Sequence, residues 1–127
     1  MIVYFNDRFL PKAEVHISPD DRGFLFGDGA YEVICSYNGK LFQADKHLDR
    51  LARSLHALCI TRPEQTLLRA IAAQLIHDNQ LGDQVATIYL QITRGVAPRR
   101  HAFPDSNTPP TIYAAAKPFQ HPHAQQA

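Results

Sequence analysis

The sequence predicts an α+β fold in which an antiparallel sheet carries two helices packed on one of its faces. Three observations predict it: two strand-like hairpins lie within the first 42 residues, two amphipathic segments follow, and two more strand-like segments come last. Strands, then helices, then strands favour a single helical layer on a single sheet. A length of 127 residues is enough for one domain with its own core. We expect that domain to span residues 1–117.

The first strands are indicated by short apolar runs and turn residues. Ile2–Phe5 and Arg8–Leu10 flank Asn6 and Asp7, which predicts a hairpin at the start of the chain. Residues 31–37 alternate, with the odd-numbered side chains on one face and the even-numbered ones on the other. Asn38-Gly39 is typical of a tight hairpin turn, after which Leu41 and Phe42 begin a return strand.

A glycine-rich segment lies between these two hairpins. Residues 20–29 read DDRGFLFGDG, with three glycines in seven positions, so the backbone can turn sharply or pass close to another group. We expect an irregular loop, in which Asp21 and Arg22 could form a local ion pair. Neither a Walker loop nor a Rossmann fingerprint fits the glycine spacing.

The period then changes to that of helices. From Asp45 onward, leucines recur three and four residues apart, at Leu48, Leu51, Leu55 and Leu58, which predicts an amphipathic helix. A second helix is expected to begin at Pro63 and to stop at Leu81-Gly82.

The last part of the chain returns to strands. Residues 85–94 alternate and are rich in β-branched side chains, and residues 111–116 form a further predicted strand. A proline-rich loop, residues 95–110, joins them. We expect residues 118–127 to be an interdomain linker or a tail, because they hold one large apolar residue and two prolines.

Composition excludes several classes of protein. A net charge of +1 argues against a dedicated nucleic-acid or membrane binder, and no apolar stretch is long enough to span a bilayer. Cys35 and Cys59 have no metal-ligand or disulfide spacing, so we expect two free, buried thiols and a cytoplasmic protein. The seven histidines show no close metal-binding spacing, and no metal site is expected.

A few side chains could bind anions. Arg99, Arg100 and His101 follow a proline on a loop, and guanidinium groups bind carboxylates and phosphates through paired donors. From the residues alone, this cluster could equally be a solvated basic loop. Arg50 could be a surface residue paired with Asp49 or Glu64, and Tyr31 a half-buried strand aromatic.

Taken together and in order, these segments resemble the class IV pyridoxal-phosphate aminotransferases, most closely those acting on D-amino acids. The resemblance rests on DRGFLFGDGAYEVICSYNGKLFQADKHLDRL, residues 21–51, and on ITRGVAPRRHAFP, residues 92–104. It covers nearly the whole chain. It implies the small N-terminal domain of that fold and an aminotransferase that moves an amino group between D-alanine, or other D-amino acids, and 2-oxoglutarate.

The resemblance also implies roles for single residues. Arg50 matches the family's ligand to the phosphate of pyridoxal 5'-phosphate. Tyr31, Arg99 and His101 match the group that holds the substrate carboxylate, with Arg99 and His101 reaching the site of a neighbouring subunit, so a homodimer is expected. Arg100 could widen that surface or face solvent.

In the family, the lysine that binds the cofactor covalently lies in a second domain, which we expect to fall outside these 127 residues. We therefore expect no catalytic lysine here and an isolated chain that does not transaminate. Two alternatives within the family stay open, an aminodeoxychorismate lyase and a branched-chain aminotransferase. A third alternative is a non-catalytic, anion-binding dimerisation module.

Overall fold

The computed structural model describes residues 1–104 and 107–120, and it contains one antiparallel sheet of six strands. The strands lie in the order β2-β1-β6-β5-β3-β4. Their bounds are β1 Ile2–Phe5, β2 Arg8–Pro11, β3 Gly29–Tyr37, β4 Lys40–Leu41, β5 Val85–Thr93 and β6 Thr111–Pro118. Both predicted hairpins are present, β1 with β2 and β3 with β4. The predicted α+β architecture is confirmed.

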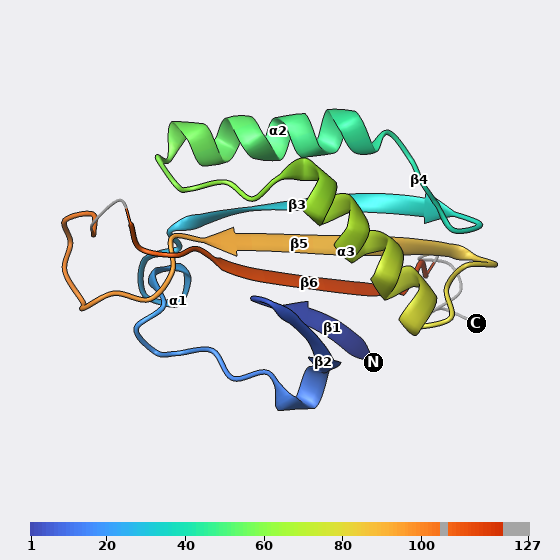
Figure 1. Ribbon diagram of the computed structural model, residues 1–127, viewed down its shortest axis with the longest axis horizontal. Helices are drawn as coiled ribbons and strands as arrows, with labels where there is room; N and C mark the ends of the chain where they lie inside the picture. Colours follow the sequence, from blue (N-terminus) through green and yellow to red (C-terminus); the bar gives the residue numbers. More distant parts are fainter. Residues whose placement is uncertain (105–106, 121–127) are drawn as a thin grey trace.

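Two long helices, α2 (Ala44–Ala57) and α3 (Gln65–Asp78), cover one face of the sheet (Figure 1). Their buried side chains pack against inward-facing residues of the central strands. The fully buried members of this core include Leu48, Leu51, Leu55, Ile71, Leu75, Ile88, Leu90 and Ile92. The 3.5-residue recurrence of the α2 leucines is thus explained by one helix face meeting one sheet face.

Alternation in β3 separates its side chains as predicted. Glu32, Ile34 and Ser36 are buried beneath the helices, whereas Tyr31, Val33 and Tyr37 are exposed on the opposite face. Neither α2 nor α3 lies on that opposite face (Figure 1). The functional side chains of β3 are therefore divided between two faces of the sheet.

The glycine-rich segment was predicted as an irregular loop, and this is wrong in one respect. It contains a short helix, α1 (Arg22–Phe26), which the Asp21 carboxylate caps by accepting a hydrogen bond from the Gly23 amide over 2.8 Å. Gly27 ends it in the left-handed conformation, at φ 63°. Five residues are too few to show a hydrophobic period, so only these capping residues could have indicated the helix.

The bounds of α3 also differ from the prediction. Glu64 is its N-cap in an extended conformation, so the helix begins two residues after Pro63. It ends at Asp78, because the Asn79 side chain turns back to the Leu75 carbonyl and also bonds the backbone of Ile2. Gln80 then takes a left-handed φ of 57°. The helix end is thus tied to the first strand.

Two expectations concern the thiols and the tail. Cys35 and Cys59 are free, but neither is fully buried: Cys35 is half-buried, and Cys59 is exposed because it lies in the turn after α2 at φ 56°. Strand β6 continues to Pro118, two residues beyond its predicted end. Residues 121–127 of the expected linker lie outside the described residues. No helix in the described ranges is long and apolar enough to cross a membrane.

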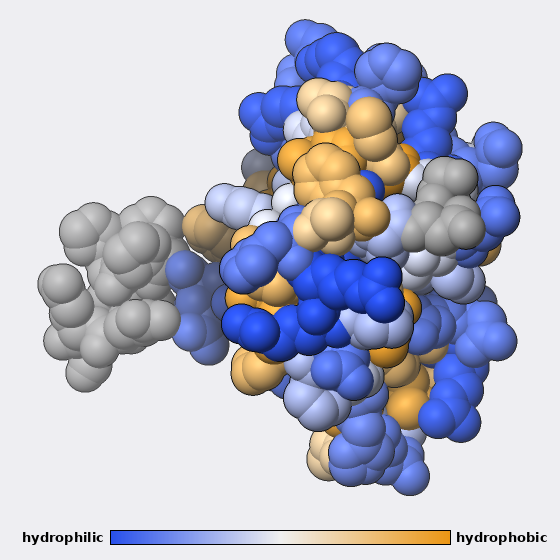
Figure 2. All heavy atoms as spheres, turned by 90° about the vertical axis from the view of Figure 1, so that its left-hand side faces the viewer, coloured by the Kyte–Doolittle hydropathy of each residue, from blue (hydrophilic) through white to orange (hydrophobic). Residues whose placement is uncertain are grey.

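One end of the molecule brings α1 beside the loop that follows β5 (Figure 1). A short 3-10 helix, η1 (Lys12–Glu14), lies earlier on the connection that leads to α1. Figure 2 views this end and shows hydrophobic side chains gathered between hydrophilic ones. Phe24, Val96 and Phe103 are exposed large apolar residues of these segments.

Candidate cofactor and substrate site

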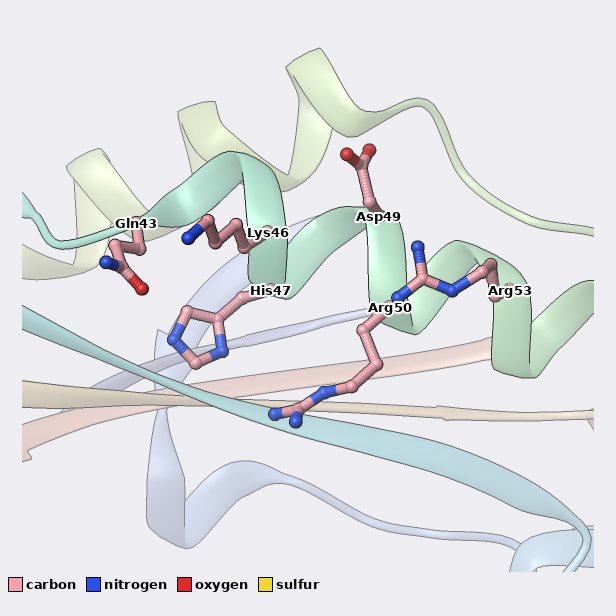
Figure 3. Close-up of a pocket in the computed structure, with 6 residues that line it drawn as sticks. All are labelled: Gln43, Lys46, His47, Asp49, Arg50 and Arg53. Carbon is pink, nitrogen blue, oxygen red and sulfur yellow. The ribbon is translucent and has the colours of Figure 1, made fainter.

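A buried carboxylate on β3 holds two side chains of α2. His47 and Arg50 are three residues apart and so share one helix face, and both point from α2 toward β3 (Figure 3). His47 Nδ1 lies 2.7 Å from one Glu32 oxygen, and Arg50 Nε donates to the other over 3.0 Å. Arg50 Nη2 also donates to Glu32. The result is a two-donor arginine–carboxylate pair fixed on the sheet.

The electrostatics of Glu32 follow from this pairing. Burial alone would raise the pKa of its carboxyl group, but hydrogen bonds from Arg50 and His47 outweigh burial and lower that pKa below its usual value. Glu32 is therefore ionised at neutral pH, although only 4% of its side chain is exposed. It orients Arg50 without hiding it, because 63% of the Arg50 side chain stays exposed.

Arg50 lines an open pocket of about 400 Å³ along α2. The other lining residues are Gln43, Lys46, His47, Asp49 and Arg53 (Figure 3). Asp49 points away from the sheet in this view and accepts a hydrogen bond from Gln65 rather than from Arg50. Three permanent cations against one carboxylate make a donor set that fits the phosphate of a cofactor.

Tyr31 lies on the other face of β3 from Arg50. The residue is 65% exposed, and its ring stacks on that of Tyr89 with centroids 6.0 Å apart. Tyr113 on β6 continues the row beyond Tyr89. Burial raises the pKa of Tyr89, and the neighbouring Tyr31 and Tyr113 raise it further, so its hydroxyl stays protonated.

The two faces meet at the outer edge of β3. Strand β4 pairs with β3 only at Ser36 and Tyr37, so within the described chain no strand lies beside residues 29–34 on that side. Arg50 lies over one face of this part of β3, through its bonds to Glu32, and Tyr31 lies on the other face.

The basic loop after β5 lies at the α1 end of the molecule. Arg99, Arg100 and His101 are all exposed, and the His101 ring lies 5.5 Å from that of Phe26. Arg22 holds the loop by donating to the Arg100 carbonyl over 2.7 Å. Within the part of the chain that the structure describes, neither Arg99 nor His101 contacts Tyr31. The four predicted site residues thus fall into three separate groups.

Sequence reasoning missed the residues that support these groups. Glu32 could have been noticed, because an acidic side chain on the buried face of an alternating strand requires a cationic partner. The suggested Asp21–Arg22 ion pair is wrong: Arg22 pairs with Asp28 at 2.8 Å, whereas Asp21 accepts from Thr93 Oγ1 over 2.7 Å.

Comparison with known proteins places this geometry in a family. The sequence pattern of the family described as amino-transferase class IV matches residues 29–127. The chain belongs to the class IV aminotransferases. This class IV chain is 39% identical over 125 residues to the D-alanine aminotransferase of Staphylococcus haemolyticus, covering 95% of this chain and 43% of that protein. It is also 39% identical to the enzyme of that name from Bacillus licheniformis, covering 99% of this chain and 44% of the relative. The chain thus spans less than half the length of these relatives.

Solved structures confirm the class IV fold. The branched-chain amino acid aminotransferase of Escherichia coli superposes with a TM-score of 0.80 at 18% identity, over 93% of this chain and 41% of that one. The 4-amino-4-deoxychorismate lyase of Pseudomonas aeruginosa gives a TM-score of 0.71 at 26% identity, over 98% of this chain and 43% of the lyase.

Proposed function

We propose that this chain is the N-terminal domain of a pyridoxal-phosphate-dependent D-amino-acid transaminase. The reaction moves an amino group between D-alanine, or another D-amino acid, and 2-oxoglutarate. One observation carries the proposal: buried Glu32 fixes an exposed Arg50 in a pocket that holds two further cations, a donor set for the cofactor phosphate. The identity to two D-alanine aminotransferases supports the D-specific assignment over the other reactions of the fold.

Arg50 and the surrounding cations bind the cofactor phosphate in this proposal. Glu32 holds the Arg50 guanidinium in place, so that little side-chain entropy is lost when the phosphate binds. Bound pyridoxal phosphate supplies the electron sink for the reaction. The contribution of Arg50 and its neighbouring cations is to anchor the cofactor phosphate beside β3.

Tyr31, Arg99 and His101 hold the substrate carboxylate. Because Arg99 and His101 do not contact Tyr31 in the described chain, we propose that they act in the site of a neighbouring subunit of a homodimer. Holding the carboxylate on one side of the cofactor determines which face of the α-carbon meets the catalytic base, and thereby selects D-substrates.

The catalytic lysine is supplied by another part of the protein. The four lysines in the sequence are Lys12, Lys40, Lys46 and Lys117, and all are exposed. An amine in open solvent lacks the desolvation that activates a lysine nucleophile. The proposal is consistent with a chain that spans 43% of its relative's length, and it implies that this segment alone does not transaminate.

The test is an assay of the complete protein on three sets of substrates. We expect transfer from D-alanine to 2-oxoglutarate, with little activity on L-leucine or aminodeoxychorismate. Preference for L-leucine would instead identify a branched-chain aminotransferase, and pyruvate release from aminodeoxychorismate a lyase. Absence of all three activities in a folded dimer would favour a non-catalytic anion-binding module.

A further inference from the structure

A buried ion network joins α1 to the strand that precedes the basic loop. The Asp28 carboxylate accepts from Arg22 Nε over 2.8 Å and from Arg94 Nε over 2.6 Å. A third bond comes from Arg94 Nη2 over 3.1 Å. The Arg22 side chain is 4% exposed, and those of Arg94 and Asp28 are 8% exposed. Two arginines on one carboxylate leave a net positive charge that other acceptors must satisfy.

Those acceptors are main-chain carbonyls on distant segments. Arg94 donates to the Leu58 and Cys59 carbonyls, over 2.6 and 3.2 Å, at the end of α2. Arg22 Nη1 donates to the Arg100 carbonyl over 2.7 Å, with the Ala102 carbonyl farther away at 3.5 Å. The network therefore fixes the loop backbone at Arg100, which lies between Arg99 and His101, the two candidate ligands of the substrate carboxylate.

Aromatic rings cover the same guanidinium groups. The Arg22 guanidinium lies 4.7 Å from the Phe26 ring centroid, and that of Arg94 lies 4.2 Å from the Phe103 centroid. Phe26 also contacts the His101 ring at 5.5 Å. Rings over guanidinium planes are attracted electrostatically and shield the hydrogen bonds from water. The loop is thus held through its backbone by Arg22, through the Phe103 ring by Arg94, and through the His101 ring by Phe26.

We propose that Arg22 is a positioning residue that fixes the Arg99–Phe103 loop so that Arg99 and His101 are presented to the substrate carboxylate. This inference rests on the proposed function, in which those two residues bind that carboxylate. The guanidinium suits the task because its rigid fork spans Asp28 and the Arg100 carbonyl at once. A lysine carries one donor group and cannot span both partners.

The first test measures loop order without any substrate. In the complete protein, Arg22→Lys keeps a cation beside Asp28 and so preserves the buried pairing. Trypsin cleaves after Arg99 and Arg100, which are exposed in the single chain and are open to the protease in the proposed dimer whenever the loop leaves the neighbouring site. We expect Arg22→Lys to be cut at these two bonds at least several-fold faster than the parent, with Arg8→Lys on the exposed part of β2 as the matched control. Equal cleavage rates in all three proteins would overturn the proposal.

The second test separates positioning from a general effect on folding. Loss of loop order should raise the KM for D-alanine and for 2-oxoglutarate by about tenfold, which corresponds to one lost hydrogen bond, with a smaller change in kcat. Partial unfolding would lower the apparent kcat at unchanged KM, and that result would contradict a positioning role. The KM of the Arg99→Met variant is measured alongside, because a raised KM there tests whether Arg99 binds the substrate carboxylate at all.

The trypsin test and the kinetic test can give different answers, and each combination decides a different claim. If cleavage accelerates and Arg99→Met raises KM while Arg22→Lys does not, the loop needs no positioning and the inference fails alone. If Arg99→Met leaves KM unchanged as well, the carboxylate-binding role fails and the inference fails with it.

Discussion

The Arg50 guanidinium and the Glu32 carboxylate form a two-donor pair in which Nε and Nη2 of the arginine both face the acid, with Nε 3.0 Å from Oε2. The acid is buried and the arginine is open to solvent. In the described part of the chain, Arg50 Nη1 has no protein acceptor. That arrangement presents the free nitrogen of a fixed guanidinium to an incoming anion.

Replacing Arg50 should therefore weaken cofactor binding. In the complete protein we expect Arg50→Lys to raise the Kd for pyridoxal phosphate by about tenfold or more, because a hydrogen bond to a charged group contributes roughly 1.5–3 kcal/mol. Lysine keeps a positive charge near Glu32, so the fold should persist. Equilibrium dialysis measures the change, and Arg62→Lys on the exposed connection between the helices is the control. An unchanged Kd in Arg50→Lys would remove Arg50 from the phosphate site.

Removing the Tyr31 hydroxyl should weaken substrate binding alone. Tyr31→Phe retains the ring that stacks on Tyr89 and deletes one donor, so the KM for D-alanine should rise by about tenfold with the cofactor Kd unchanged. Tyr37→Phe is a matched control, since Tyr37 is exposed on the same face of β3 at its far end. Steady-state kinetics on the complete protein measures both KM values. Equal KM values in Tyr31→Phe and Tyr37→Phe would contradict a role for the Tyr31 hydroxyl in substrate binding.

Stability should depend on pH through Asp28 and Glu32. Burial raises the pKa of Asp28, but hydrogen bonds from Arg94 and Arg22 outweigh burial, and the pKa of Glu32 is lowered in the same way by Arg50 and His47. Both folded values thus lie below unfolded values of about 3.9 and 4.3. The stability that they contribute is complete above about pH 5 and is lost as the pH falls through 4 toward the folded pKa values.

Denaturant unfolding of the complete protein between pH 7 and pH 3 measures this loss. In Glu32→Gln the decline below about pH 5 should be shallower, because one of the two linked groups is gone. Glu14→Gln, at an exposed position, should retain the full slope. Identical slopes in the parent and Glu32→Gln would show that the pairing does not stabilise the fold.

Gly95 should tolerate no side chain. Its φ is 106°, and a Cβ would lie 2.0 Å from the Pro109 carbonyl oxygen, so Gly95→Ala should lower the free energy of unfolding by about 3 kcal/mol. At Gly82 no atom lies within 4 Å of an added Cβ, so Gly82→Ala should be nearly neutral. Chemical denaturation of both variants tests this pair, and equal midpoints would contradict it.

The elements that could be predicted from the sequence are those whose conformation depends on residues close to one another in the chain. Alternation in β3, the Asn38-Gly39 turn and the leucine spacing of α2 each depend on a few adjacent residues, and each is confirmed. The short helix α1 escaped prediction because five residues show no period. Contacts between distant segments escaped for a different reason: Arg22 and the Arg100 carbonyl are 78 residues apart, and no local pattern links them.

The candidate site, too, has residues that the sequence could identify and contacts that it could not. Recognition of the two signatures identified Arg50, Tyr31, Arg99 and His101 as candidates, but their roles remain predictions. The sequence could not reveal that β3 separates Arg50 from Tyr31, since this depends on which face of the sheet the helices cover. Nor could it reveal Glu32 as the partner of Arg50, because Asp49 is adjacent in sequence and equally acidic.

The free edge of β3 has a further consequence. A strand with no neighbour on one side presents backbone amides and carbonyls that can template another strand, and exposed aromatic and β-branched side chains strengthen such pairing. Residues 29–34 combine both properties, with Tyr31 and Val33 exposed. This unpaired edge is thus also a part of the domain that is prone to aggregation, and keeping it covered protects solubility as well as the site.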